Sequence, residues 1–70
     1  GRANNEYKSK AFRRSLYFIN PLKKGMKISN KDIRRIRPGF GLEPKYENQI
    51  IGKKLSKDVE RGDPVSWEVL

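Results

Sequence analysis

Residues 22–33, with the sequence LKKGMKISNKDI, recur in altered form as residues 59–70, VERGDPVSWEVL, at an offset of 37 residues. Five aligned columns agree in chemistry: Leu22 with Val59, Gly25 with Gly62, Ile28 with Val65, Ser29 with Ser66, and Ile33 with Leu70. In each copy an apolar residue ends a strand, a charged pair and a glycine form a turn that needs a positive φ angle, and an apolar residue follows. The recurrence predicts two similar units related by a pseudo-twofold axis, and chance convergence of short strand–turn sequences is the alternative.

A serine follows the second apolar residue of each copy and is expected to stop the strand and to cap a short helical turn. Ser29 precedes Asp32 by three positions, which is the spacing of a capping box. In the second copy Glu68 follows Ser66 closely, and a carboxylate early in a helical turn suits the helix dipole.

The segments around the two copies have contrasting patterns. Residues 14–20, RSLYFIN, are rich in aromatic and β-branched residues and predict the main strand, with residues 54–59 as a weaker counterpart. Two short helices are predicted, one over residues 30–36 with Ile33 and Ile36 on one face, and one over residues 44–51. The second would begin at Pro44 and stop at Gly52, and its inward side chains would be Tyr46, Ile50 and Ile51.

Composition restricts the chemistry that this chain can perform. With 70 residues it is one small domain, and with neither cysteine nor histidine it has no disulfide framework, thiolate metal site or histidine-based catalysis. The 17 Lys+Arg against 8 Asp+Glu give a net charge of +9, which favours anionic partners. The basic residues are spread in pairs with no recognition helix or stacking motif, which disfavours nucleic-acid binding.

The organisation of the chain is that of one module joined to something else. Residues 1–11, GRANNEYKSKA, are polar and aperiodic and predict a linker, so that the folded domain comprises residues 12–70. There is no apolar stretch long enough to cross a membrane and no signal-peptide h-region. The only methionine is Met26, and we expect a piece of a larger protein or a processed product, of cytoplasmic type.

Residues 35–44, RIRPGFGLEP, predict a stiff projecting loop. Pro38 cannot continue the predicted helix and restricts Arg37, while Gly39 and Gly41 allow unusual φ angles and Phe40 can anchor the turn. A guanidinium held in one position binds an anion or a carbonyl oxygen at a lower ordering cost. Arg37 is therefore the candidate binding residue; the alternative is that it complements a helix C-terminus. Trp67 is expected in the core or at a domain interface.

Five motifs in this order resemble the C-terminal antifreeze-like domain, also called the SAF domain, of bacterial sialic-acid-type synthases. They are RRSLY at 13–17, LKKG at 22–25, IRPGFGL at 36–42 with PKY at 44–46, IGKK at 51–54, and RGDPVSW at 61–67. The group comprises the N-acetylneuraminate, legionaminate and pseudaminate synthases. The resemblance implies a mostly β fold with short helical turns, the pretzel-like β-clip that fish type III antifreeze proteins share.

The resemblance also implies a parent enzyme whose N-terminal (β/α)8 barrel condenses phosphoenolpyruvate with an N-acylated amino sugar, using a divalent metal, Mn or Mg. The small domain would be exchanged across a homodimer and would cap the partner's barrel active site. It would have no catalytic residue, metal or cofactor of its own and no activity in isolation. Arg37 would reach the amino sugar, with Gly39, Phe40 and Gly41 beside it as substrate-binding positions.

Two further functions remain open at this point. A free-standing SAF module could bind a saccharide or act as an assembly chaperone, as other members of the superfamily do. Ice binding is the third possibility, but the chain contains no threonine and carries nine excess positive charges, which are poor properties for a flat ice-binding surface. The loop sequence does not specify which amino sugar a synthase of this type would use.

Overall fold

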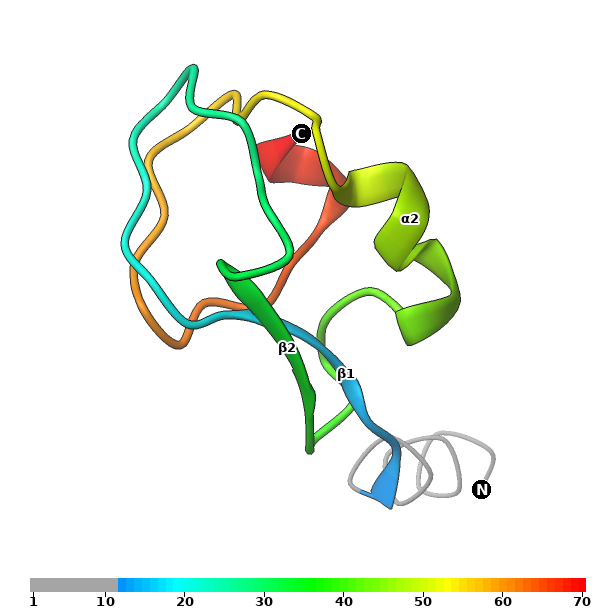
Figure 1. Ribbon diagram of the computed structural model, residues 1–70. Coiled ribbons are helices and arrows are strands. Elements are labelled where there is room, and N and C mark those ends of the chain that lie inside the picture. Colours follow the sequence, from blue (N-terminus) through cyan, green and yellow to red (C-terminus); the bar gives the residue numbers. More distant parts are fainter. Residues whose placement is uncertain (1–11) are drawn as a thin grey trace.

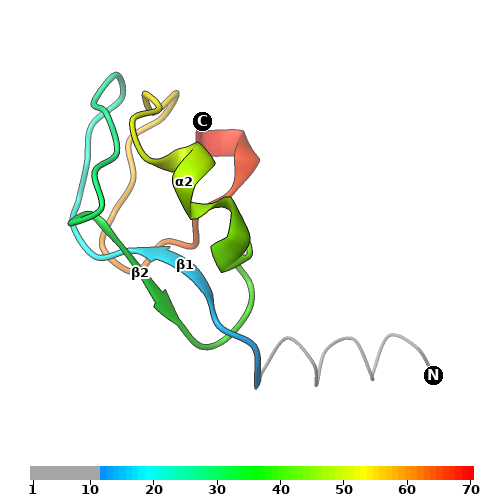
Figure 2. The same ribbon diagram turned by 45° about the vertical axis from the view of Figure 1, so that its right-hand side comes forward.

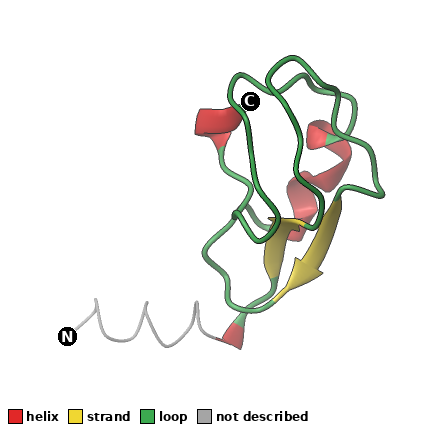
Figure 3. Ribbon diagram, turned by 90° about the vertical axis from the view of Figure 1, so that its left-hand side faces the viewer, coloured by secondary structure: helices red, strands yellow, loops and turns green. Residues whose placement is uncertain are grey.

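The computed structural model describes residues 12–70, so the predicted linker at residues 1–11 lies outside the described residues. The elements, in chain order, are β1 (Ser15–Phe18), β2 (Ile33–Ile36), the 3-10 helix η1 (Pro44–Tyr46), α2 (Glu47–Ile50) and the 3-10 helix η2 (Trp67–Val69). Turns and loops make up most of the remaining chain (Figure 3). This is the small, mostly β architecture with short helices that the sequence predicts. Within the described part of the chain, no helix is long and apolar enough to cross a membrane.

β1 and β2 form a two-stranded antiparallel sheet and lie side by side in Figure 1. Their register places Ser15 opposite Ile36 and Phe18 opposite Ile33. All four residues of β1 are buried, whereas β2 buries only Ile33 and leaves Ile36 39% exposed. The predicted strand at residues 14–20 is confirmed in this shorter form.

The predicted helix at residues 30–36 is wrong, because residues 33–36 form β2. Isoleucines three positions apart fit one face of a helix, but they are also β-branched residues that suit a strand. Pairing with the fully buried β1 satisfies the backbone of this segment, and this long-range contact overrides the local pattern.

The two segments that carry the glycine turns run side by side in Figures 1 and 2, and their hydrogen bonds place the two turns at opposite ends of the pair. Leu22 and Val59 exchange two backbone hydrogen bonds of 3.0 and 2.9 Å. The predicted strand at residues 54–59 is reduced to isolated bridges, Lys54 with Lys27 and Val59 with Leu22. Gly25 and Gly62 have φ angles of 89° and 95°, which confirms the predicted conformation of both turns.

Other backbone hydrogen bonds occur in pairs. Within a pair, each residue of one hydrogen bond is replaced in the other by the residue 37 positions away in the sequence. These pairs are Gly25 N–H to Leu55 O with Gly62 N–H to Phe18 O, Leu55 N–H to Met26 O with Phe18 N–H to Asp63 O, and Ile28 N–H to Lys53 O with Val65 N–H to Leu16 O. The two sequence copies thus make matching contacts, each with the segment that precedes the other copy.

The core is formed by buried apolar residues from both copies, from β1 before the first copy, and from the segment between the copies. They are Leu16, Phe18, Leu22, Ile28, Ile33, Ile50, Leu55, Val59 and Val65. The predicted helical region at residues 44–51 is confirmed as η1 followed by α2, with Pro44 at its start and Gly52 at a φ of 92° after it. Ile50 is fully buried, and Tyr46 and Ile51 pack against the core as predicted.

The two serine positions behave differently from expectation. The backbone N–H and the hydroxyl of Ser29 both donate to the Asp32 carboxylate at 2.9 Å, so the predicted pairing exists, but it closes a turn before β2. Ser66 precedes η2 in an extended conformation and makes no side-chain capping hydrogen bond. The sequence therefore located both turns correctly, but it predicted a helix after Ser29 where a turn leads into β2.

Candidate functional site

The loop after β2 is attached to β1 through the carbonyl oxygen of Pro38. The hydroxyl of Ser15 donates to this oxygen at 2.9 Å, and the hydroxyl of Tyr17 donates to it at 2.6 Å. The two donors are two positions apart on one strand, which places them on the same face of it. The Arg37–Pro38 peptide bond in this loop is cis. The start of the loop is thus fixed to a strand that is buried along its whole length.

Gly41 fixes the other end of the loop. Its backbone N–H donates to the Ser15 hydroxyl at 3.0 Å, and a Cβ at this position would overlap the carbonyl oxygen of Leu16. From the sequence, glycine at positions 39 and 41 was expected to serve unusual φ angles, but neither residue has a positive φ. At Gly41 the need for glycine comes from the close approach of two backbone segments.

Arg37 is exposed, and within residues 12–70 its guanidinium forms no hydrogen bond or ion pair. The residues before it form β2, so the alternative that it complements a helix C-terminus is wrong. Its neighbours Arg34 and Arg35 are exposed on β2, and Arg35 Nε lies 2.8 Å from Glu47 Oε1 on α2. Arg37 is therefore a solvent-facing cation at the start of a loop, residues 37–41, that hydrogen bonds fix to β1. We call this loop the clamped loop.

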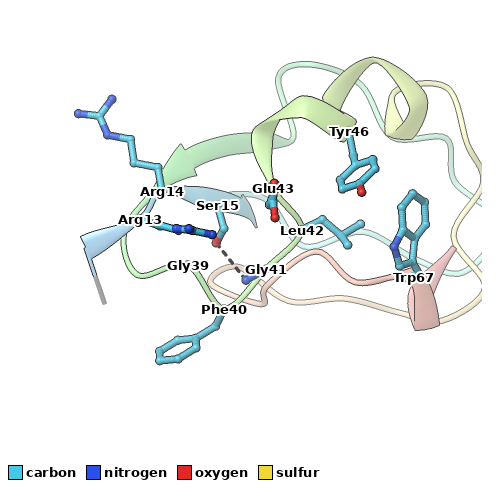
Figure 4. A pocket seen from close by; sticks show the side chains of 10 residues that line it. All are labelled: Arg13, Arg14, Ser15, Gly39, Phe40, Gly41, Leu42, Glu43, Tyr46 and Trp67. Carbon is cyan, nitrogen blue, oxygen red and sulfur yellow. Dashed lines mark hydrogen bonds between the residues drawn. The ribbon is translucent and has the colours of Figure 1, made fainter. Parts of the chain in front are cut away.

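A half-open pocket of about 340 Å³ adjoins the loop (Figure 4). It is lined by Arg13, Arg14, Ser15, Gly39, Phe40, Gly41, Leu42, Glu43, Tyr46 and Trp67. Three of the four predicted site residues, Gly39, Phe40 and Gly41, thus come together here, while Arg37 is not part of the lining. Phe40 is 53% exposed, and its ring points away from the other lining side chains (Figure 4).

One wall of the pocket is aromatic and apolar. The rings of Tyr46 and Trp67 meet edge to face, with centroids 5.4 Å apart and planes at 75°, and Leu42 lies beside them. Trp67 is 49% exposed, so the expectation of a core position is wrong, and the alternative of a domain interface stays a prediction.

The polar side of the pocket contains charges of both signs. In Figure 4 the side chain of Arg13 extends over Ser15 toward the pocket, whereas that of Arg14 points away from it. Arg13 and Glu43 both line the pocket, and no ion pair joins these two described residues. Glu43 Oε2 instead pairs with Lys45 Nζ at 3.7 Å, and both of those side chains are exposed, so this ion pair is weak. Both groups retain hydrogen-bonding capacity for a ligand.

Sequence reasoning missed Arg13, Glu43 and Trp67 as members of one site. The RRSLY and RGDPVSW motifs contained two of them, but nothing in either motif indicates that they meet. Within residues 12–70 there is no group of three carboxylates that could hold a metal ion, and the pocket offers donors, an acceptor and aromatic surface. The arrangement is equipped to bind a small polar ligand.

The chain is similar in sequence to one part of each of several larger proteins. It is 46% identical over 56 residues to pseudaminic acid synthase from Campylobacter jejuni, matching 80% of this chain and 16% of that protein. It is 36% identical over 67 residues to N,N'-diacetyllegionaminic acid synthase from Legionella pneumophila, matching 94% of this chain and 19% of that protein. The chain therefore spans between a sixth and a fifth of the length of these relatives.

A solved structure has the same fold. The spore coat polysaccharide biosynthesis protein SpsE from Bacillus subtilis superposes with a TM-score of 0.79 at 24% identity, covering 100% of this chain and 21% of that one. The SAF domain family matches residues 13–70, which include both sequence copies, the clamped loop and the pocket. The chain therefore belongs to the SAF domain family.

Proposed function

We propose that this domain is the C-terminal, substrate-capping part of a synthase that condenses phosphoenolpyruvate with an N-acylated amino sugar. Two observations support this: the similarity to pseudaminic and legionaminic acid synthases, and the small share of those proteins that the chain spans. The name of the Legionella relative specifies two N-acetyl groups. We therefore take amino sugars with two N-acyl groups as the substrate class to test.

The finer description of the fold is also part of this proposal. The domain would comprise residues 12–70 after a linker at residues 1–11, and it would be a pretzel-like β-clip built about a pseudo-twofold axis. The pairs of backbone hydrogen bonds whose residues are related by an offset of 37 positions support the pseudo-twofold relation. The family match from residue 13 supports the boundary.

Arg37 would enter the amino-sugar site of a (β/α)8 barrel, the one belonging to the partner protomer of a homodimer. The observation that carries this assignment is the combination of an unpartnered, exposed guanidinium with a loop held by Ser15 and Tyr17 through one carbonyl oxygen. Because these hydrogen bonds fix the backbone next to Arg37, only the side chain has to be ordered on binding. Gly39, Phe40 and Gly41 would form the adjoining part of the sugar contact.

The chemistry of the condensation would belong to the barrel. A divalent metal, Mn²⁺ or Mg²⁺, and the phosphoenolpyruvate ligands would be held there, because the described residues of this domain form no carboxylate cluster suited to a metal. The domain would supply binding and coverage without a catalytic group, in a cytoplasmic enzyme.

The test is Arg37→Ala in the full-length synthase that carries this domain. Loss of a charged hydrogen bond to the sugar corresponds to about 1.5–3 kcal/mol, so we expect kcat/KM for the amino sugar to fall about 10- to 100-fold. The KM for phosphoenolpyruvate should change much less, because its ligands lie in the barrel. Steady-state kinetics with each substrate varied in turn would measure both.

Arg34→Ala is the matched control, because Arg34 is an exposed arginine on β2 outside the loop and the pocket. It should leave both substrate dependences unchanged. An Arg37→Ala enzyme with wild-type dependence on the amino sugar would remove Arg37 from the site.

A further inference from the structure

The pocket beside the clamped loop combines three chemical properties. Arg13 supplies hydrogen-bond donors, the Glu43 carboxylate supplies acceptors, and Leu42, Tyr46 and Trp67 supply apolar surface. In Figure 4 the side chains of Arg13 and Tyr46 lie on opposite sides of Glu43. The donor, the acceptor and the apolar wall therefore follow one another along the pocket.

This order matches the chemistry of an N-acyl group. Its carbonyl oxygen accepts hydrogen bonds, as a guanidinium requires, and its N–H donates one, as a carboxylate requires. Its methyl group is small and apolar and can pack against an aromatic ring. A simple anion would satisfy Arg13 but would be repelled by Glu43, and a simple cation would be repelled by Arg13. An uncharged amide satisfies both groups at once.

We infer that this pocket binds an N-acyl group of the amino-sugar substrate, at a different part of the sugar from the one that Arg37 contacts. The inference rests on the proposed function and deepens it. Gly39 and Gly41 line the pocket and belong to the same loop as Arg37, so the two contacts would lie on neighbouring parts of one ligand. A sugar with two N-acyl groups presents one of them to the pocket while Arg37 contacts another part of the sugar, so the pocket would select for that group.

The experiment uses the full-length synthase with a di-N-acylated amino sugar and the two analogues in which one or the other N-acyl group is replaced by a hydroxyl. The variants are Arg13→Met and Glu43→Leu, which remove the donor and the acceptor, and Glu43→Gln, which retains an acceptor. Arg13 and Glu43 are both exposed, so these changes leave the core intact. Arg34→Met is the matched control for loss of an exposed arginine.

We expect Arg13→Met and Glu43→Leu each to lower kcat/KM for the di-N-acylated sugar about tenfold or more, since each removes a hydrogen bond to a charged group. Both should have little effect with one of the two analogues, the one that lacks the group bound in the pocket. Glu43→Gln should recover part of the activity lost in Glu43→Leu, and Arg34→Met should match wild type with all three sugars.

Two results would overturn the inference. One is that Arg13→Met and Glu43→Leu leave kcat/KM unchanged; the other is that they reduce it equally for all three sugars, as expected if another part of the protein covers the pocket. The Arg37→Ala variant distinguishes a failure of the pocket assignment from a failure of the proposed function. If Arg37→Ala impairs sugar use while the pocket variants do not discriminate, only the pocket assignment fails. If Arg37→Ala has no effect, the proposed contact between Arg37 and the amino sugar fails.

Discussion

Ser15 and Tyr17 direct two hydroxyl groups of one buried strand at the same carbonyl oxygen, that of Pro38. Ser15 is 1% exposed and the only polar residue among the described ones that is classed as buried with the core. It also accepts the backbone N–H of Gly41, so one hydroxyl connects both ends of the loop. Buried polar groups persist where they are hydrogen-bonded, and here the bonded partner is the segment that presents Arg37.

The contribution of one of these hydrogen bonds can be measured with Tyr17→Phe. The ring of Tyr17 is 7% exposed and would stay packed, so the variant removes little more than the donor to Pro38. We expect the free energy of unfolding to fall by about 1 kcal/mol, or the Tm by roughly 4–8 °C for a domain of this size. Urea and thermal unfolding of the 70-residue chain would measure both quantities.

Tyr46→Phe provides the matched comparison for this variant. Within residues 12–70 the hydroxyl of Tyr46 forms no hydrogen bond, so its removal should change stability by less than about 0.5 kcal/mol. Equal losses in the two variants would mean that the Tyr17–Pro38 contact does not stabilise the loop.

At the scale of elements, the turn at residues 29–32 determines where β2 begins. Asp32 Oδ2 accepts hydrogen bonds from the N–H and the hydroxyl of Ser29, and Oδ1 accepts one from the Asn20 side-chain amide at 3.2 Å. Partial burial alone would raise the pKa of Asp32, but these hydrogen bonds favour the ionised form and hold its pKa below the ordinary value. The turn is therefore stabilised by an ionised carboxylate.

The pH dependence of stability should report this carboxylate. Because the folded pKa of Asp32 is lower than the unfolded one, its contribution is fully present above about pH 4 and is lost as the pH falls through the folded pKa. Asp32→Asn should lower the urea midpoint at pH 7 and should weaken its fall between about pH 4 and pH 2. Urea titrations at several pH values would test this.

Glu68→Gln is the control for general acid effects, because the carboxylate of Glu68 is exposed and accepts no hydrogen bond within the described residues. Its pH profile should follow that of the wild type. If Asp32→Asn and Glu68→Gln gave the same profile, the lowered pKa of Asp32 would have no consequence for folding.

At the scale of the whole molecule, the proposed exchange across a homodimer makes a prediction about mixed subunits. An Arg37→Ala protomer has an intact barrel, and a protomer inactivated in its barrel has an intact Arg37. In a mixed dimer with exchanged domains, one active site receives both intact parts. Random mixing of equal amounts of the impaired Arg37→Ala protomer and the barrel-inactivated protomer should then give about a quarter of the wild-type activity, in a two-fold symmetric dimer.

The same experiment distinguishes exchange from coverage within one subunit. If each domain covered its own barrel, every site in the mixture would lack one part, and no activity would return. The isolated 70-residue chain serves as a further control and should form no product from phosphoenolpyruvate and amino sugar. Product formation by this chain alone would contradict the assignment of catalysis to the barrel.

The sequence alone determined the features that depend on local chemistry. The glycine turns at Gly25 and Gly62, the main strand before them and the helical region starting at Pro44 were predictable because φ preferences and β-branched or proline residues act over a few positions. The ordered motifs were sufficient to indicate the SAF family. Arg37 stood out because proline and glycine follow it directly.

Only the tertiary structure decided the features that depend on contacts between distant segments. Residues 33–36 became a strand because β1 was available to pair with them, although their spacing also suited a helix. Gly41 proved necessary because Leu16, far away in the sequence, approaches its backbone. Arg13, Glu43 and Trp67 came to line one pocket from three separate segments, and no local pattern encodes that meeting. Local preferences restrict each segment, whereas the site arises from how the segments pack.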